Sequence, residues 1–479
     1  MKVAIVGGGP SAFYVASRLL SRLNDTRLRV HVFDRLWAPH GLVRYGVAPD
    51  HPEVKNCTNK FDKVAADPRF RFYGNVNVGT PPPQGMAQTV QLGLDDLQRH
   101  YSHLVFATGC TLPALHTALA ESPWSMPALG FVHWYTQHPS APPPPALDTL
   151  THVSLIGNGN VALDIARILL TPPAVLEKYD VPQPVLDLLR RSTVRHVDII
   201  ARRGPINAAF TAKELRELIH LPDASMRPLD PALLIPPPSA SRQQSRILQL
   251  LGQGSRNAFG STPKTWALEF FKSPTGIAPP PPGESDPRLL LANTALDAEG
   301  RSVPQTPAPP LRTSLVIPSL GFRAEPAPTP FFDPALGHLR AHAGRVLDAD
   351  GRVVRNVYAS GWAANGAKGV LATTMMDAYA VADVVATDLG VPVEGDVQGD
   401  AAAALADMHP EFAMNPAPAD DFPPPKVAAA RVVTYPEWKR VDAEEVRRGE
   451  LLGKERERMG WEEAEAFLWD GAPVDLIQK

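Results

Sequence analysis

Two glycine-rich segments of the same kind constrain the fold of this 479-residue chain more than any other feature. The first segment, residues 2–34, has an apolar strand, a glycine turn at residues 7–12, a helix with apolar side chains at helical spacing, and a second apolar strand. The second segment, residues 152–202, repeats that order around a turn at residues 157–162. Both turns fit G-x-G-x-x-G/A, whose glycines let a pyrophosphate approach the amides at a helix N-terminus. The sequence therefore predicts an α/β fold with two Rossmann-like dinucleotide-binding domains.

The residues that end the two segments differ in charge. Asp34 ends the first, where a carboxylate can accept hydrogen bonds from a ribose, although a surface turn residue would have the same place in the sequence. Arg202 and Arg203 end the second, where two guanidinium groups can pair with a 2′-phosphate or form a solvated charged turn. This difference favours one cofactor that is held permanently and one that is exchanged, with NADP preferred over NAD at the second site. FAD with NADPH is the economical pair, because a flavin accepts a hydride from a nicotinamide and can release electrons singly.

Composition excludes several other classes of protein. Lys and Arg total 47 against 50 Asp and Glu, and the net charge of -3 gives no general attraction to nucleic acid. Cys57 and Cys110 are the only cysteines, so there is no disulfide framework, C-x-x-C redox pair or thiolate cluster, and no metal site is predicted. No apolar run reaches the roughly 18 residues that span a bilayer. Redox chemistry must therefore come from a bound organic cofactor.

Seven segments carry a resemblance to a known family: residues 41–52 (GLVRYGVAPDHP), 73–79, 159–173, 201–218, 270–277, 360–374 and 435–449. Through them nearly the whole chain resembles adrenodoxin reductase, the mitochondrial type of ferredoxin-NADP reductase, which has bacterial relatives. The resemblance implies a glutathione-reductase-like architecture, in which an NADP domain is inserted into a discontinuous FAD domain. Residues 1–108 would begin the FAD domain, residues 109–322 would form the NADP domain, and residues 323–479 would complete the FAD domain and end in a helical segment.

The resemblance also implies the cofactor-binding residues. For FAD these are Gly7, Gly9, Ser11, Ala12, Asp34, Leu42, Val78, Trp362, Gly369, Val370 and Leu371. For NADP these are Asn158, Gly159, Asn160, Val161, Arg202, Arg203, Glu214 and Gly369. Two of them have alternatives: Trp362 could be a core aromatic, and Glu214 could hold the arginines, bind the nicotinamide-side ribose or be a surface acid of a helix.

His51 and Asp164 are the candidate catalytic residues that the resemblance implies near the flavin, where they would tune nicotinamide placement or pass a proton to solvent. A packing histidine before Pro52 is the alternative for His51. The chain also departs from the family at two places. Asp34 stands where the family usually has Glu, and residues 364–368 replace a basic pair followed by Gly and Pro, which changes the charge presented to a protein partner.

The function implied is an NADPH:adrenodoxin or ferredoxin oxidoreductase, whose partner is a small acidic [2Fe-2S] ferredoxin. Arg216 and Arg246 are placed to meet that partner if the chain follows its relatives, or they are solvated charges of a helix face. The rival interpretations are an NADPH-dependent diaphorase or oxidase that uses small acceptors or oxygen, and a non-catalytic FAD-binding scaffold. We expect a monomer in the mitochondrial matrix, with the cytoplasm as the alternative because no presequence is visible before the first strand.

Overall fold

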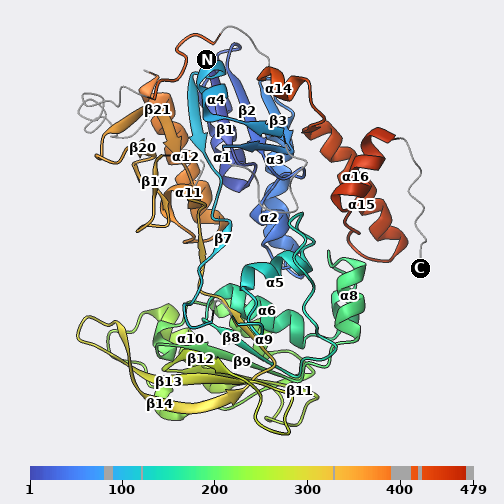
Figure 1. Cartoon of the computed structure of the whole chain (residues 1–479), viewed down its shortest axis with the longest axis vertical. Helices are drawn as coiled ribbons and strands as arrows, with labels where there is room; N and C mark the ends of the chain where they lie inside the picture. Colours follow the sequence, from blue (N-terminus) through green and yellow to red (C-terminus); the bar gives the residue numbers. More distant parts are fainter. Residues whose placement is uncertain (80–89, 120–121, 327–329, 390–411, 419–422, 471–479) are drawn as a thin grey trace.

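The computed structural model describes residues 1–79, 90–119, 122–326, 330–389, 412–418 and 423–470. Its largest sheet has eight strands in the order β19-β20-β21-β6-β1-β2-β3-β22. Their bounds are β1 Lys2–Val6, β2 Arg29–Asp34, β3 Phe70–Gly74, β6 His103–Phe106, β19 Ala341–His342, β20 Arg345–Leu347, β21 Val353–Ala359 and β22 Val433–Thr434. Strand β21 lies parallel to β6, so both ends of the chain build one sheet. Figure 1 shows this as strands of blue and orange side by side.

Helices cover both faces of this sheet, which explains why every residue of β1 is buried. Val3 and Ile5 face a core shared with α1 (Pro10–Arg22), α3 (Thr58–Ala65) and α12 (Leu371–Asp388). Ala4 and Val6 face a second core, with α4 (Leu94–His100) and the small pair β4 (Val76–Val78) and β5 (Val90–Leu92). Successive side chains of β1 point to opposite faces of the sheet, and each face is covered by an apolar core.

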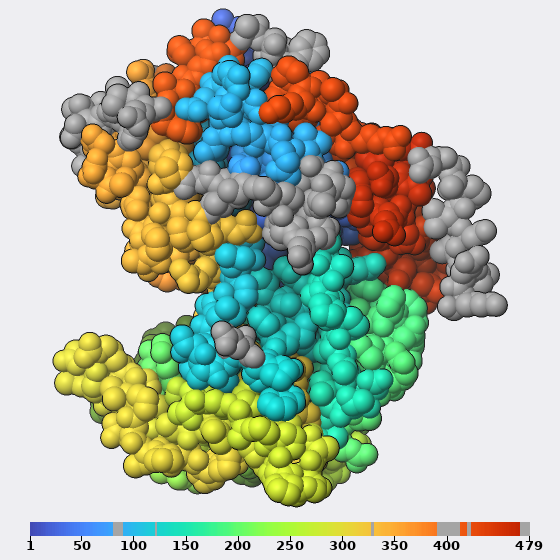
Figure 2. All heavy atoms as spheres, viewed as in Figure 1, coloured from blue at the N-terminus to red at the C-terminus, as the bar shows by residue number. Residues whose placement is uncertain are grey.

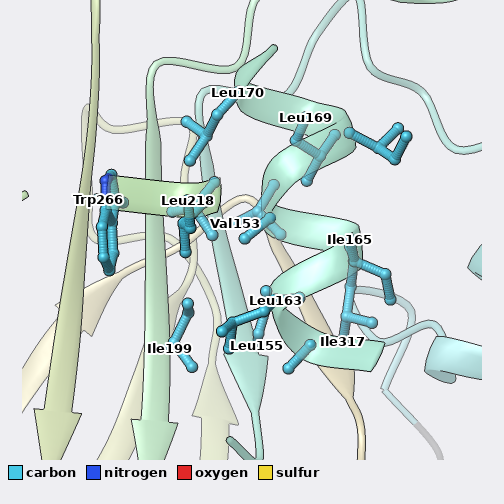
Figure 3. Packing of buried hydrophobic residues seen from close by; sticks show 14 of the residues in the cluster. Val153, Leu155, Leu163, Ile165, Leu169, Leu170, Ile199, Leu218, Trp266 and Ile317 are labelled. Atoms are coloured by element: carbon cyan, nitrogen blue, oxygen red, sulfur yellow. The ribbon is translucent and has the colours of Figure 1, made fainter. Parts of the chain in front are cut away.

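The second sheet has five parallel strands in the order β10-β11-β9-β8-β15. Their bounds are β8 His152–Ile156, β9 His196–Ala201, β10 Ala224–Met226, β11 Lys264–Phe270 and β15 Leu315–Pro318. Figure 3 shows Leu163 of α6 (Asn160–Leu170) next to Leu155 of β8 in the core of this body. An antiparallel sheet of β12 (Lys272–Ala278), β13 (Arg288–Leu296) and β14 (Ser302–Arg312) is attached to it.

The remaining elements are short or connect these layers. The helices are α2 Leu42–Tyr45, α5 Ala128–Tyr135, α7 Pro173–Leu176, α8 Gln183–Arg190, α9 Ala212–Ile219, α10 Arg242–Gln253, α11 Trp362–Asn365, α14 Pro425–Ala428, α15 Tyr435–Leu451 and α16 Trp461–Glu465. The 3₁₀ turns are η1 Pro52–Cys57, η2 Pro205–Asn207 and η3 Pro231–Leu234, and a π-helical turn, η4, spans Ala466–Asp470. The small strands are β7 Leu112–Pro113, β16 Phe322–Arg323, β17 Phe332–Asp333 and β18 His338–Leu339.

Two chain crossings join the body of the first sheet to the body of the second. Strand β7 leads out of the first body and β16 leads back, and the two pair as antiparallel neighbours. Figure 2 shows that the surface is hollowed between the two bodies on the left of the view. None of the helices in the described residues is long and apolar enough to cross a membrane.

The predicted fold class is confirmed: the chain is α/β, with two mainly parallel sheets of Rossmann-like strand order. In the first sheet the order β3-β2-β1-β6 places the two strands of the first glycine segment at its centre. The order β11-β9-β8-β15 does the same for the second segment. The domain limits at residues 108/109 and 322/323 stay a prediction.

Candidate functional site

The first glycine turn joins β1 to α1 in a conformation that needs glycine. Gly7 has a φ of 104°, and its amide donates to the carbonyl of Phe33 at 2.7 Å. A Cβ on Gly7 would lie 2.4 Å from the carbonyl oxygen of Ala107, so no larger residue fits. A Cβ on Gly9 would meet nothing within 4 Å. The side of the turn above Gly9 is therefore open for a ligand to approach the N-terminus of α1.

Backbone amides hold the carboxylate of Asp34 in place beside the first glycine turn. Its Oδ2 accepts from the amide of Gly8 at 2.6 Å, and its Oδ1 accepts from the amide of Leu36 at 2.8 Å. Burial raises the pKa of Asp34 to about 6, although these two N–H groups favour its charged form. Each carboxylate oxygen can accept a further bond. Asp34 is thus a buried acid of the first turn, and its interpretation as a surface turn residue is wrong.

Residues near the end of the chain return to this turn. The hydroxyls of Ser11 and Ser360 are 2.7 Å apart, and the next residue, Gly361, has a φ of 63°. The amide of Gly361 donates to Oδ2 of Asp377 at 2.6 Å, and the side-chain amide of Asn365 donates to Oδ1 at 2.8 Å. Asp377, which the sequence analysis did not single out, therefore fixes the backbone before α11.

Trp362 comes directly after Gly361 and is only partly buried. Its ring stacks on Phe322 with a centroid separation of 6.0 Å, and its Nε1 donates to the carbonyl of Lys368 at 3.0 Å. Phe322 lies in β16, the crossing that returns from the second body. Trp362 thus stands at the junction of the two bodies.

The other predicted FAD contacts lie near the starts of α1, α2 and α12 and at the end of β4. Gly369, with a φ of 83°, precedes Val370, which is the N-cap of α12 and donates its amide to Oγ1 of Thr373 at 2.9 Å. Val370 is 56% exposed, so its side chain is accessible from solvent. Leu371 is the first residue of α12, and Leu42 is the first residue of α2. Val78 is the last residue of β4, and Ala12 belongs to α1.

The second glycine turn repeats the geometry of the first. Gly157 has a φ of 115°, and its amide donates to the carbonyl of Ile200 at 2.8 Å. A Cβ on Gly157 would lie 2.3 Å from the carbonyl oxygen of Ser319, whereas one on Gly159 would meet nothing within 4 Å. The second turn is therefore also packed against backbone at its first glycine and open to a ligand at its second glycine.

Asn160 connects this turn to α9. It begins α6, and its Oδ1 accepts from the amide of Thr211 at 2.8 Å. Thr211 is the N-cap of α9. Asn158 and Val161, which also belong to residues 157–162, are half-buried. The N-termini of α6 and α9 are thus held close together at the predicted NADP site.

Arg202 and Arg203 are exposed, and their loop is held only by its backbone. The carbonyl of Arg202 accepts from the hydroxyl of Thr294 in β13 at 2.7 Å and from that of Ser302 in β14 at 2.8 Å. Neither guanidinium forms an ion pair within the residues that the structure describes. Both side chains therefore remain available to a phosphate.

Arg167 of α6 is the centre of an ion-pair network that crosses between the two bodies. Its Nε and Nη2 donate to the carboxylate of Asp50 at 2.6 and 3.0 Å, so a residue of the first body is held bidentately. It also donates to Glu214 at 2.9 Å and to Asp164 at 2.8 Å. Burial and the charges of Glu214 and Asp50, opposed by Arg167, raise the pKa of Asp164 to about 7. Asp164 can therefore hold a proton near neutral pH.

His51 crosses the same junction. Its Nε2 is 2.6 Å from Oε2 of Glu217, and its Nδ1 is 3.8 Å from Oε1 of Glu214. Burial opposes the imidazolium, but the hydrogen bond to Glu217 and the charges of Glu214 and Asp50 together outweigh it, and the pKa of His51 is raised. His51 thus makes charge contacts to α9 that a mere packing histidine would not make. Glu214 is buried and pairs with Arg167, so it neither holds the arginine pair nor lies on a helix surface.

Ligand atoms of His51, Glu214 and Glu217 lie within 4.8 Å of one another, a spacing that a metal ion could use. Glu214 already pairs with Arg167 at 2.9 Å, and Glu217 lies 2.6 Å from His51 and 3.6 Å from Arg167, so both carboxylates have protein partners of their own. We therefore assign this cluster to charge pairing.

Comparison with known proteins agrees with this geometry. A family model described as FAD-NAD(P)-binding matches residues 4–57. The mitochondrial NADPH:adrenodoxin oxidoreductase of Bos taurus is 38% identical over 482 residues, which cover 96% of this chain and 90% of the relative. The chain belongs to the adrenodoxin reductase family.

Bacterial proteins are among the relatives as well. NADPH-ferredoxin reductase FprA of Mycobacterium tuberculosis is 34% identical over 473 residues, covering 95% of this chain and 96% of the relative. The solved structure of M. tuberculosis FprA in complex with NADPH aligns with a TM-score of 0.80 at 32% identity, covering 97% of this chain and 98% of that one. The relatives thus include mitochondrial and bacterial proteins.

Four residues of the junction were missed by the sequence analysis: Asp50, Arg167, Glu217 and Asp377. For Arg167 a signal existed, because it lies three residues after Asp164 on a helix whose other residues in that turn are apolar. Asp50 lies inside a segment that carried the family resemblance. Glu217 likewise lies inside residues 201–218, which carried the resemblance, whereas Asp377 left no signal that separates it from an ordinary helix acid.

The two arginines predicted to meet a partner of this family are both exposed. Arg216 lies on α9, and Arg246 lies on α10, where it donates to the side chain of Gln249 at 2.7 Å. Neither forms an ion pair within the described residues. Their exposure is compatible with docking and equally with a solvated helix face.

Proposed function

We propose that this chain is an FAD-dependent reductase that takes electrons from NADPH and passes them singly to a [2Fe-2S] ferredoxin. Residues 109–322 would be its NADP domain, inserted between the two parts of an FAD domain at residues 1–108 and 323–479. One observation carries the proposal. The chain has two nucleotide turns of the same geometry, one closed by a buried acid and the other followed by two exposed arginines.

Both turns fit the cofactors for which they are proposed, because Gly9 and Gly159 leave open space in front of a helix N-terminus. At the first turn residues 7–12 would hold the FAD pyrophosphate, and Asp34 would accept from a ribose. At the second, Arg202 and Arg203 would bind the 2′-phosphate of NADPH. Bound FAD supplies the chemistry of accepting a hydride and releasing single electrons.

The residues of the junction would hold the two bodies together and position the nicotinamide between them. Arg167 and Asp50 hold α6 against the first body, and Trp362 covers the crossing at β16. His51 and Asp164 each have a raised pKa at this place. We propose that they hold protons at the junction and position the nicotinamide, which keeps the candidate catalytic roles expected from the sequence.

An anaerobic titration of the purified protein with NADPH and, separately, NADH tests the function. We expect the visible flavin absorption to bleach rapidly with NADPH and poorly with NADH. A colourless protein, or one that neither nucleotide reduces, would reject the proposal and favour a non-catalytic scaffold. Fast oxygen consumption without stimulation by ferredoxin would favour the oxidase.

Docking of the ferredoxin is tested by charge. Arg216→Glu together with Arg246→Glu should raise the ferredoxin concentration for half-maximal rate, and the wild-type rate should fall steeply with salt, because exposed charges are screened within about 10 Å at 0.1 M. Arg447→Glu is a matched control, since Arg447 is an exposed arginine on α15, a helix far from α9 and α10 in Figure 1. A salt-independent rate would remove the two arginines from the docking surface.

The finer points of cellular context remain part of the proposal. We propose a monomer in the mitochondrial matrix, in line with the mitochondrial relatives, and the bacterial relatives make the cytoplasm the alternative. Fractionation of the source cells and size-exclusion chromatography with light scattering test these two points.

A further inference from the structure

The loop between α15 and α16, residues 452–459, crosses from the first body to the second and is called the strap below. Its backbone and side chains bind the segment of residues 178–183 that precedes α8. The amide of Glu455 donates to the carbonyl of Lys178 at 3.1 Å, and Oε1 of Glu457 accepts from the amide of Gln183 at 2.9 Å. The strap is thus hydrogen-bonded along the edge of the second body.

A buried three-way ion pair lies at the centre of these contacts. Nε and Nη2 of Arg458 donate to the two carboxylate oxygens of Asp180 at 2.8 and 2.5 Å. Lys55, from η1 of the first body, donates to Oδ2 of Asp180 at 3.1 Å. The side chains of Arg458 and Asp180 are only 1% and 4% exposed. The two cations outweigh the effect of burial and hold the pKa of Asp180 well below its usual range.

The other end of the strap is anchored in the first body. Arg456 donates to Asp442 at 2.7 Å and lies 3.3 Å from Glu445, and the amide of Met459 donates to Glu445 at 3.0 Å. Glu445 is fully buried and accepts two hydrogen bonds from Arg44 of α2, at 2.7 and 2.9 Å. Ion pairs therefore tie the strap to α2 and α15 of the first body on one side and to Asp180 of the second body on the other, and the backbone of residues 456–459 joins the two sets.

Such a chain of contacts restrains motion that two bodies joined by two crossings would otherwise have. A buried ion pair contributes little net stability, but its geometry is demanding, and removal of one partner leaves an uncompensated charge. Hydride transfer in turn needs the reacting atoms about 3 to 3.5 Å apart, and a displacement of about 1 Å can cost about 100-fold in rate. The strap lies on the side of the molecule away from the hollow of Figure 2, so it joins the two bodies at the edge opposite that hollow.

We propose that Asp180 and Arg458 are positioning residues, through which the strap fixes the orientation of the second body and so the alignment of NADPH with the flavin. The proposal rests on the proposed function. Neither residue would contact a cofactor, and their effect would be on the rate of hydride transfer.

The experiment uses the full-length, FAD-loaded protein in anaerobic stopped-flow reduction by NADPH. Asp180→Asn should lower the limiting rate of flavin reduction about 10-fold or more, with less than about a threefold change in the NADPH concentration for half-maximal rate. Arg458→Lys, which keeps the charge but loses the bidentate fork, should give an intermediate rate. Asp187→Asn is the matched control, because Asp187 forms an exposed pair with Arg190 on the neighbouring α8 and should change nothing.

Two further readouts separate positioning from damage. Flavin content and the rate at which ferricyanide reoxidises dithionite-reduced flavin should stay at the wild-type values in Asp180→Asn, since neither needs the second body. A limiting rate within about twofold of wild type overturns the proposal, and so does a loss that ferricyanide reoxidation shares in proportion. If Asp180→Asn does not fold, Arg458→Lys decides by the same criteria.

Failure of the proposed function would look different, because the wild-type flavin itself would then resist NADPH. In that case small-angle scattering tests the strap directly. Asp180→Asn should increase the largest dimension of the particle relative to wild type and to Asp187→Asn, and identical scattering profiles overturn the proposal.

Discussion

The two glycine turns are alike in backbone and opposite in surroundings. At the first, Asp34 is buried and holds the amide of Gly8, and its pKa is raised by burial to about 6. At the second, Arg202 and Arg203 stand in solvent on a loop held only by its carbonyl. Turns of the same backbone geometry thus differ in the side chains at the end of the second strand, and this difference underlies the two roles that we propose for them. A closed, buried partner suits a cofactor that stays, and an open, charged partner suits one that comes and goes.

The largest effect should come from breaking the feature that both turns share. Gly7→Ala places a Cβ 2.4 Å from the carbonyl of Ala107 at a φ of 104°, so we expect loss of bound flavin and destabilisation by more than about 3 kcal/mol. Gly9→Ala, whose Cβ meets nothing within 4 Å, should fold normally and lose affinity only for the cofactor. Denaturant unfolding and flavin absorbance after desalting measure both. Equal unfolding of the two variants would contradict the assignment of open space above Gly9.

The next largest effect should come from the open site. Replacing Arg202 and Arg203 together with Ala removes two charge-assisted contacts of about 1.5 to 3 kcal/mol each, and the half-saturating NADPH concentration should rise about 100-fold or more. The value for NADH should hardly change. Steady-state rates with both nucleotides measure this. An equal loss for NADH and NADPH would show that the arginines do not read the 2′-phosphate.

Burial of Asp34 at the first turn should make the free energy of unfolding depend on pH. The folded pKa of Asp34, about 6, lies above the roughly 3.9 of an unfolded aspartate, so the folded chain holds a proton that the unfolded chain releases. The contribution of Asp34 to stability is therefore fully present below about pH 4 and is lost as the pH rises through about 6. Between pH 4 and 7 the FAD-free wild type should lose about 2 kcal/mol of unfolding free energy relative to Asp34→Asn. Parallel pH profiles of the two proteins would refute a buried Asp34.

The smallest effect is expected at the contact between the two sites. Burial opposes the charged forms of His51 and Glu217, but their mutual hydrogen bond and the surrounding charges outweigh it, so the pKa of His51 is raised and that of Glu217 is lowered. The contact is therefore complete between about pH 4.5 and 6.5 and is lost as the pH rises through the raised pKa of His51. Glu217→Gln should destabilise the protein by only about 1 kcal/mol at pH 6, because Glu217 is partly exposed. At pH 9 the destabilisation should be much smaller, because His51 is then neutral. Thermal unfolding at both values measures this, and a penalty that does not change with pH would contradict it.

The sequence predicted the features that depend on local pattern. Both turns, their strands and Asp34 were predicted because glycine spacing and strand periodicity depend only on residues close together in the sequence. The network of Arg167 with Asp50 was not, because the two residues are 117 positions apart and only the packing of the two bodies brings them together. Asp377 shows the same limit, since an acid within the first two turns of α12 has no local mark of its bond to Gly361. The sequence predicted the strap only as part of a C-terminal helical segment.

The pairing of β21 with β6, and of β22 with β3, has a consequence for synthesis of the chain. The nascent polypeptide first makes β1, β2, β3 and β6, whose outer strands both keep open edges until residues 353–359 and 433–434 leave the ribosome. The five-stranded sheet is complete by Pro318, and so the inserted body can finish folding while the body around it still waits. Unpaired edges of this kind invite association with other chains, so translation of this protein should depend on holding chaperones until its last strands arrive.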